Sequence, residues 1–253
     1  MLNFKIFTIF PDLFPQILNT SITGEALKKG LWNLQVINIR DYAFDARKTI
    51  DDVPFGGGAG MLFRVDVLHN ALKNNISDSN NSANFVKKNK IIYLSPRGKL
   101  FTQEMAQELA KFDEISLICG RYEGIDQRIF DLYDIEEISI GDYVLSGGEI
   151  ASYVVIDAIT RNIDGVLGAK ESLDVESFGN QNCQEYKYLL EYPQYTRPNN
   201  FMNLEVPAVL TSGHHDNIKK WQKAAAIAIT QKNRPDLYAK YLAQLKNISS
   251  KNF

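Results

Sequence analysis

The feature that most constrains the fold is an alternation of short apolar runs with amphipathic stretches from Phe4 to about Gly148. The apolar runs have the length of buried strands, and the stretches between them carry apolar residues at helical spacing. This alternation is typical of an α/β domain with a mostly parallel sheet. The predicted strands are Phe4–Phe10, Leu34–Ile39, Lys90–Ser95, Glu114–Cys119 and Ile135–Gly141.

Several predicted strands end at Gly, Ser or Pro, and ligands of parallel α/β sheets bind beyond the carboxyl ends of the strands. We therefore look for a site in the loops that follow these strands. The helices predicted between and after the strands are Phe14–Lys28, Arg64–Asn74, Thr102–Lys111, Gly124–Tyr133 and Glu149–Arg161.

The periodic pattern stops between residues 165 and 182, where glycine and charged residues interrupt it. We predict an α/β domain over 1–164, a flexible linker over 165–182 and a small helical domain over 183–253. In the last of these, Asp216 is a candidate helix cap, and Pro235 suits the first turn of another helix. The Asn- and Ser-rich stretch 74–89 is predicted to be a surface insertion, and no function is assigned to it.

Charge is unevenly distributed along a chain whose formal net charge is only −2. Residues 197–253 hold nine Lys or Arg against three Asp or Glu, whereas the upstream residues hold 19 against 27. The basic end is either a nucleic-acid-binding surface or a solvated, lysine-rich helix surface. The two cysteines, Cys119 and Cys183, are too few for a disulfide framework, and no apolar run approaches the length of a membrane helix. We expect a protein of the cytoplasm, without a membrane segment.

Glycine-bearing loops are the best candidates for a ligand site, because glycine lets backbone groups approach a ligand closely. They are Gly56–Gly60, Cys119–Gly124 and Gly141–Gly148. Any one of them is more often only a tight turn. None matches a phosphate-binding P-loop or the dinucleotide fingerprint, which disfavours a nucleoside triphosphatase or a dehydrogenase. A pocket of backbone polar groups, apolar walls and few cations, containing Tyr93, Leu94, Ser95 and Pro96, suits an adenine and an amino acid.

At these residues the chain resembles the bacterial tRNA (guanine-N(1)-)-methyltransferases, the TrmD type within the SPOUT class, nearly from end to end. The strings that carry the resemblance are Phe4–Phe14, Asp41–Ala43, Val53–Met61, Tyr93–Gly98, Cys119–Asp126, Ser139–Glu149, Gly165–Gly168, Tyr195–Pro198 and Ser212–His215. Their order and length make a chance match very unlikely.

The resemblance implies a SPOUT-type, mostly parallel sheet with a deep C-terminal trefoil knot, although threaded chains are rare, and a small helical C-terminal domain. It also implies a homodimer with a shared active site. The expected activity is transfer of a methyl group from S-adenosylmethionine to ring nitrogen 1 of the guanosine 3′ of the anticodon, tRNA position 37, when a guanosine precedes it. The expected donor-binding residues are Tyr93, Leu94, Ser95, Pro96, Gly120, Tyr122, Glu123, Ile140, Gly141, Asp142, Tyr143, Val144, Leu145, Gly147 and Gly148.

That ring nitrogen carries a proton, so the reaction needs a base and a cation that stabilises charge on the neighbouring carbonyl oxygen. Arg161 stands where the family carries its catalytic arginine. The family's base is an aspartate before Ser-Phe, whereas this chain has Glu176 before Ser177. We expect Glu176 to be the base, with Asp174 as the alternative. Glu123 is expected to contact the donor or to help hold Mg²⁺, which remains a family-level possibility.

His214 and His215 invite a zinc interpretation, but the cysteines are not spaced to complete such a site. This segment, with Arg197, Lys219, Lys220, Trp221 and Lys223, is expected to grip the anticodon stem through phosphate contacts and stacking. The alternative is two histidines at a helix start. Two other functions stay open: an RNA-binding protein that kept the donor pocket but lost its base, and a SPOUT enzyme that acts on ribosomal RNA or on another atom. Residues 165–182 are expected to order when RNA binds.

Overall fold

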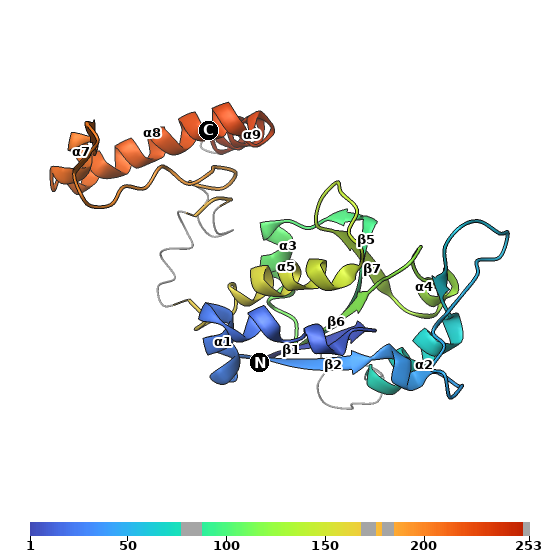
Figure 1. Cartoon of the computed structure of the whole chain (residues 1–253). Helices are drawn as coiled ribbons and strands as arrows, with labels where there is room; N and C mark the ends of the chain where they lie inside the picture. Colours follow the sequence, from blue (N-terminus) through green and yellow to red (C-terminus); the bar gives the residue numbers. More distant parts are fainter. Residues whose placement is uncertain (77–87, 168–175, 179–184, 250–253) are drawn as a thin grey trace. The chain divides into compact units, whose positions relative to one another are not determined.

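The structure, a computed structural model, describes residues 1–76, 88–167, 176–178 and 185–249. The chain divides into two compact units, Met1–Gly168 and Ala169–Phe253, and each is described by itself. Figure 1 follows the chain through both units.

The first unit is built on a parallel five-stranded sheet of order β2-β1-β6-β5-β7. Its strands are β1 (Leu2–Thr8), β2 (Trp32–Asn38), β5 (Asn89–Leu100), β6 (Glu114–Cys119) and β7 (Ile135–Ser139). The prediction of a mostly parallel α/β sheet is confirmed. Every predicted strand is present, Glu114–Cys119 with the predicted ends and the other four with one or both ends moved by a few residues. The central strand β6 is buried along its whole length, as expected of a parallel strand covered on both faces.

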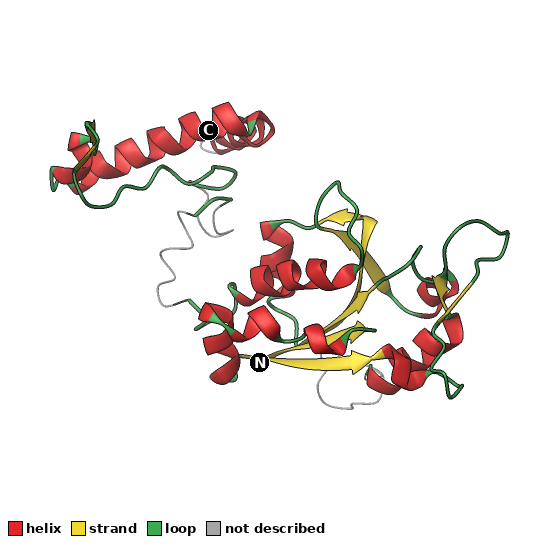
Figure 2. Ribbon diagram, in the orientation of Figure 1, coloured by secondary structure: helices red, strands yellow, loops and turns green. Residues whose placement is uncertain are grey.

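Helices cover both faces of the sheet, and a separate apolar core lies under each set (Figure 2). One core holds residues of α1 (Ser21–Lys28), α3 (Gln103–Leu109) and α5 (Gly148–Thr160). The other holds residues of α2 (Val65–Asn75) and α4 (Arg128–Leu132). Because both faces are occupied by helices, the loops at the strand ends are left as places where a ligand can enter.

Two predicted helices are shorter than expected. The stretch Phe14–Lys28 is split into the short helix η2 (Gln16–Asn19) and α1, with an extended Thr20 between them. Gly24 packs so tightly on Asn19 that an added Cβ would lie 2.3 Å from its carbonyl carbon. The predicted helix Gly124–Tyr133 begins only at Arg128, because the residues before it form the wall of a pocket.

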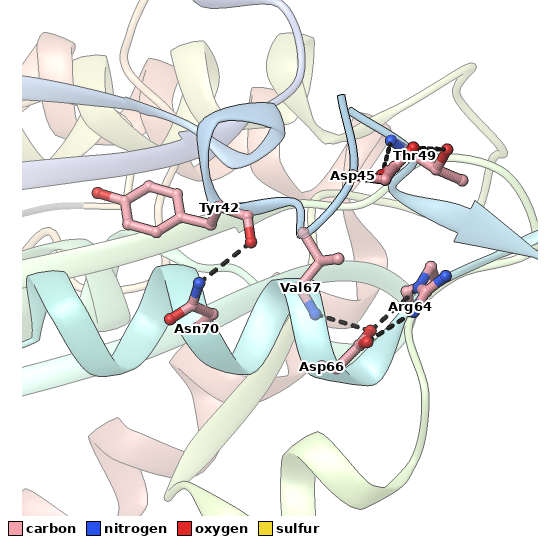
Figure 3. A network of polar contacts seen from close by, with 7 residues as sticks. All are labelled: Tyr42, Asp45, Thr49, Arg64, Asp66, Val67 and Asn70. Atoms are coloured by element: carbon pink, nitrogen blue, oxygen red, sulfur yellow. Dashed lines mark hydrogen bonds and ion pairs between the residues drawn. The ribbon is translucent and has the colours of Figure 1, made fainter. Parts of the chain in front are cut away.

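A polar network fixes the segment between β2 and α2 (Figure 3). This segment contains η3 (Ile39–Tyr42) and a two-strand ladder of β3 (Asp51–Asp52) and β4 (Leu62–Phe63). Asp66 receives two hydrogen bonds from the Arg64 guanidinium, at 3.1 and 2.6 Å, and one from the backbone N–H of Val67 at 2.9 Å. The Asn70 amide donates to the Tyr42 carbonyl at 3.1 Å. These contacts tie Arg64, which follows β4, and Tyr42 of η3 to α2.

The second unit contains the hairpin β8 (Asn200–Phe201) and β9 (Leu204–Glu205), and helices α7 (Ala208–Thr211), α8 (His215–Asn233) and α9 (Pro235–Ser249). Tyr186, Leu189, Ala226 and Tyr241 form its small core. Pro235 begins α9 as predicted. Asp216 was expected to cap α8, but it lies inside the first turn, because the helix already begins at His215.

Helix α2 and strand β5 flank the Asn- and Ser-rich stretch 74–89, of which residues 77–87 lie outside the described part of the chain. Most of the predicted linker 165–182 lies outside it as well. Across the described residues, no helix has the length and apolar character needed to cross a membrane.

Candidate active site

A cavity of about 600 Å³ opens at the carboxyl ends of β5, β6 and β7, within the first unit. Its walls come from the stretches Tyr93–Arg97, Gly120–Gln127, Ile138–Gly141 and Tyr143–Gly148, and Pro54, Phe55, Leu62 and Ala151 complete them. The volume falls in the usual range of small-molecule sites, and its position is the one that open parallel sheets use for ligands.

The first wall is a bulge in β5. Pairing with β7 shifts register between Leu94 and Lys99, so the residues between them leave the regular ladder. Gly98 lets the bulge lie against β7, since an added Cβ would be 2.3 Å from the backbone nitrogen of Ile138. Arg97 donates from its guanidinium to the Glu137 carboxylate at 3.2 Å on the exposed side. The bulge therefore turns backbone polar groups of 95–97 toward the cavity edge without breaking the sheet.

The second wall is the loop Gly120–Gly124 after β6. Backbone hydrogen bonds tie it to β4 and its preceding residue: Glu123 N–H donates to the Met61 carbonyl at 3.0 Å, and Phe63 N–H donates to the Gly124 carbonyl at 3.1 Å. Tyr122 has a φ of 59°, a left-handed conformation that is uncommon outside glycine. Strained backbone of this kind clusters at ligand sites, because the surrounding structure must hold it.

The third wall is the loop from Ile140 to the start of α5. The backbone N–H of Tyr143 donates to the Gly141 carbonyl at 2.9 Å, which makes a three-residue turn with Asp142 at its centre. The Tyr143 hydroxyl donates to the Ile140 carbonyl at 3.1 Å. Gly148 donates its N–H to the Gly120 carbonyl at 2.9 Å, which joins the third wall to the second.

The structure brings together all the residues predicted to bind the donor except Asp142, which does not line the cavity. The tight turn explains the exception, because it places Asp142 at the tip of the loop. The sequence reasoning did not single out other residues of the wall, among them Phe55, Arg97, Gln127 and Ser139. Phe55, Arg97 and Ser139 had a signal, since they stand in strings that carry the resemblance, whereas Gln127 had none.

Burial changes the chemistry of two groups beside the cavity. Tyr93 is 6% exposed, and desolvation raises the pKa of its phenol to about 12. Burial also raises the pKa of the Cys119 thiol, well above its ordinary value. Both groups are therefore neutral at physiological pH. Tyr93 presents a neutral ring and hydroxyl to the Gly120 backbone, where an added Cβ would lie 2.6 Å from the phenol oxygen.

The two residues expected to act on guanine belong to different units. Arg161 caps the end of α5 in the first unit and is half-buried. Glu176 is also half-buried and belongs to the second unit. The two residues that follow it are hydrogen-bonded to the segment 189–191. Phe178 N–H donates to the Leu189 carbonyl at 2.8 Å, and the Ser177 hydroxyl accepts from Glu191 N–H at 3.0 Å. The alternative base, Asp174, lies outside the described residues.

The second unit presents basic and aromatic side chains along α8 and the segment before it. Lys219 and Lys220 are exposed, whereas Lys223 is paired with Glu185. The rings of Tyr195 and Trp221 lie 6.1 Å apart. His214 precedes α8 and His215 begins it, so they occupy the helix start that the alternative interpretation proposed.

The cavity residues fit a donor with an adenine and an amino acid. The walls combine glycine backbone at Gly120, Gly141 and Gly147 with apolar side chains such as Leu94, Ile140 and Leu145. A divalent cation is less well provided for. Of the lining carboxylates, Asp126 already accepts two guanidinium hydrogen bonds from Arg128, which leaves Glu123 alone, and one carboxylate does not make a magnesium site. Nowhere in the described ranges do three His, Cys, Asp or Glu side chains gather as a metal site.

A parallel α/β sheet with a glycine-walled cavity at the strand ends is the arrangement of α/β proteins that bind a ligand beyond the carboxyl ends of their strands. Comparison with known proteins narrows this class. The family model described as tRNA (Guanine-1)-methyltransferase TrmD matches residues 2–240. The chain belongs to this family.

Individual relatives match over almost the same span. A protein of Clostridium tetani (strain Massachusetts / E88) is 50% identical over 93% of this chain and 92% of its own length. Proteins of Ehrlichia ruminantium (strain Welgevonden) and Rhodospirillum rubrum are 48% and 46% identical, over 93% and 94% of this chain and 94% and 93% of their own lengths. Each of the three is called tRNA (guanine-N(1)-)-methyltransferase.

Proposed function

We propose that this protein transfers a methyl group from S-adenosylmethionine to ring nitrogen 1 of the guanosine at tRNA position 37, immediately 3′ of the anticodon, when a guanosine precedes it. The observation that carries the proposal is the match of nearly the whole chain, at about half identity, to proteins named for this activity. The cavity at the ends of β5, β6 and β7 supports it with a site of suitable size and lining. The cytoplasm is the proposed compartment of the reaction, because its substrate is a tRNA.

The donor cavity supplies backbone groups and apolar walls rather than fixed charges. When bound, S-adenosylmethionine offers an electrophilic methyl group on a sulfonium. Glycine backbone at 120, 141 and 147 lets the walls approach the donor closely, and Tyr93 contributes an uncharged ring and hydroxyl. Glu123 contributes a carboxylate to the same wall. No step of the reaction proposed here passes through Mg²⁺.

Two side chains are assigned to the guanine. The Glu176 carboxylate takes the proton of ring nitrogen 1 as the new nitrogen–carbon bond forms and the sulfur–carbon bond breaks, which leaves a neutral thioether. The Arg161 guanidinium donates to the adjacent carbonyl oxygen, where negative charge develops. These assignments rest on the needs of the chemistry and on the family pattern. Glutamate is one methylene longer than the aspartate of that pattern, so the backbone around Glu176 has to compensate for the added length.

The second unit is proposed to bind the tRNA. Its exposed lysines on α8 suit the phosphates of the anticodon stem, and Tyr195 and Trp221 offer rings on which bases stack. The target base edge is buried in a base stack, so the nucleotide has to be extruded, at a cost of about a few kcal/mol that phosphate contacts offset. Residues 165–182 are proposed to order around the RNA.

We also propose that the protein works as a homodimer with a shared active site. The donor site is proposed to lie in a region of the chain that forms a deep trefoil knot. Exposed apolar side chains support the dimer. Ile150 is 63% exposed and Val154 is 45% exposed, one turn apart on the same side of α5. Tyr153 donates its hydroxyl to the Leu13 carbonyl, so the η1 segment (Pro11–Leu13), with exposed Leu13, lies alongside. The close joining of the loops after β6 and β7 is in keeping with a knot.

The test is transfer of a labelled methyl group to tRNA transcripts by wild-type and Glu176→Gln protein. Transcripts with guanosine at positions 36 and 37 should be methylated by the wild type, and transcripts with adenosine at 37 should not. Glu176→Gln should lower turnover by about 10²- to 10⁴-fold, the usual contribution of a general base, with donor binding unchanged. Wild-type protein that binds tRNA and donor but transfers no methyl group would favour the RNA-binding alternative.

A further inference from the structure

An ion pair with a buried carboxylate lies at the wall of the donor cavity, which Arg121 lines, and it has no assigned role. Glu149, in the first turn of α5, is 1% exposed. Its Oε2 accepts from Arg121 Nε at 3.0 Å, and its Oε1 accepts from the Thr8 hydroxyl at 2.8 Å. Both carboxylate oxygens are therefore used, one by the loop after β6 and one by the end of β1.

Arg121 extends the contact to the third wall of the cavity. Its Nη1 donates to the Ser146 carbonyl at 3.2 Å, and its guanidinium carbon lies 4.6 Å from the centre of the Phe10 ring. Gly147 follows directly, and an added Cβ there would lie 2.2 Å from Arg121 Nε. The guanidinium thus fills the space between the second and third walls of the cavity.

Burying a carboxylate is costly, and an ion pair in place of apolar packing is rarely kept for stability alone. Among the described residues, one side chain joins the loops Gly120–Gly124 and Ile140–Gly148: Arg121 of the first loop donates to the Ser146 carbonyl of the second. Glu149 holds the same guanidinium. A cavity lined by backbone groups depends on the exact spacing of its loops, because a backbone donor cannot change rotamer to follow its ligand.

We infer that Arg121 and Glu149 are positioning residues for donor binding: the pair fixes the gap between the two glycine loops. Thr8, at the end of β1, holds the carboxylate, and Phe10, two residues further on, holds the guanidinium. Neither residue's function is to touch the reacting atoms. The inference rests on the proposed donor site, and it predicts that damage to the pair weakens donor binding while recognition of RNA is kept.

The experiment measures the affinity of the full-length protein for S-adenosylmethionine and S-adenosylhomocysteine by calorimetry, together with the melting temperature and the KM for tRNA. Glu149→Gln removes the charge and keeps the size. Arg121→Lys keeps the charge and loses the forked contact to Glu149 and Ser146. Each should weaken donor binding by roughly tenfold or more, with the tRNA KM unchanged.

A matched control separates this role from general loss of stability. Lys5 and Glu114 form a second largely buried ion pair, at 2.8 Å, at the opposite end of the sheet strands β1 and β6. Glu114→Gln is the same chemical change in the same unit. It should lower the melting temperature and leave donor affinity as in the wild type.

The double variant tests whether the two residues act together on donor affinity. If the pair acts as one unit, Arg121→Lys combined with Glu149→Gln should bind the donor about as weakly as either single variant. Donor affinity that stays at the wild-type value in folded Arg121→Lys and Glu149→Gln, or that falls equally in Glu114→Gln, would overturn the inference and leave the proposed function intact. Wild-type protein that binds neither ligand would instead contradict the proposed function.

Discussion

The backbone N–H of Gly148 donates to the carbonyl oxygen of Gly120 at 2.9 Å, across 28 residues of sequence. The contact joins the first residue of α5 to the residue that follows β6. An added Cβ at Gly148 would lie 2.7 Å from the Cα of Cys119, closer than side-chain and backbone carbons approach. The start of α5 can therefore reach β6 only with glycine at this position.

Gly148→Ala should push α5 away from β6 and open the donor cavity. We expect a loss of stability of about 1–3 kcal/mol, typical of overpacking, and donor affinity that falls at least as much as stability. Denaturant unfolding and calorimetry measure the two effects. Gly30→Ala is the control, because Gly30 has a left-handed φ of 69° but open space around it. Its variant should lose stability without a change in donor binding.

Arg161→Ala should lower methyl transfer by about 10²- to 10³-fold, the usual effect of removing one group that stabilises developing charge. Donor affinity should be unchanged, because Arg161 does not line the donor cavity. Single-turnover rates with saturating tRNA measure the effect. Arg161→Lys should recover part of the rate, since it restores the charge without the fork. Full activity of Arg161→Ala would remove the arginine from the reaction.

Lys219→Ala and Lys220→Ala should weaken tRNA binding and reduce its dependence on salt. Each lost phosphate contact is expected to lower the slope of log affinity against log salt by roughly one. Filter binding across a salt series measures both quantities. Lys28→Ala is a suitable control, because Lys28 is paired with Glu25 on the first unit. An unchanged slope in the α8 variants would mean that this basic surface is merely solvated.

Val154→Glu should convert a dimer into monomers, because it places a charge on the exposed apolar side of α5. Light scattering after size-exclusion chromatography gives the mass, and methyl transfer should fall along with dimer content. Lys73→Glu introduces the same residue at an exposed position of α2, on the other face of the sheet, and should leave the mass unaltered. A wild-type protein that is monomeric at micromolar concentration contradicts the proposed assembly.

Tyr93 predicts a pH effect at the alkaline end. Its pKa is about 12 in the folded protein, against about 10 when unfolded. The folded state therefore holds the phenol proton where the unfolded state has lost it, and stability falls as pH rises from 10 through 12. Tyr93→Phe should flatten this fall by up to roughly 3 kcal/mol in urea unfolding. Identical curves for the two proteins above pH 10 would show that burial of Tyr93 does not govern the effect.

The strands could be predicted because runs such as Glu114–Cys119 are buried on both faces, and that burial is reflected in a mostly apolar run, here Ile115 and Leu117–Cys119. The cavity loops could be predicted for a similar reason, since glycine marks backbone that must approach something closely. Helix boundaries were less predictable. The break between η2 and α1 at Thr20 goes with a close contact between Gly24 and Asn19, and the spacing of apolar residues in the sequence does not reveal such a contact.

The Arg121–Glu149 pair could not be predicted from spacing, because 28 residues separate its members and the sheet alone brings them together. Asp142 shows the opposite limit. It stands among residues that all line the cavity, yet a three-residue turn carries it out of the wall. The pairing of Glu176 with a guanine is a matter of reaction chemistry and family pattern, and it stays a prediction.

All the walls of the donor cavity come from residues between Pro54 and Ala151. The basic, aromatic surface of α8 lies in a later stretch of chain with its own small core. With the RNA-binding role proposed for α8, substitutions after residue 185 can change which RNA is preferred while the unit that contains the cavity keeps its structure. Conversely, substitutions that adapt the protein to other RNAs would leave the residues of the glycine-walled cavity unchanged, so a small molecule that fills this cavity would still bind.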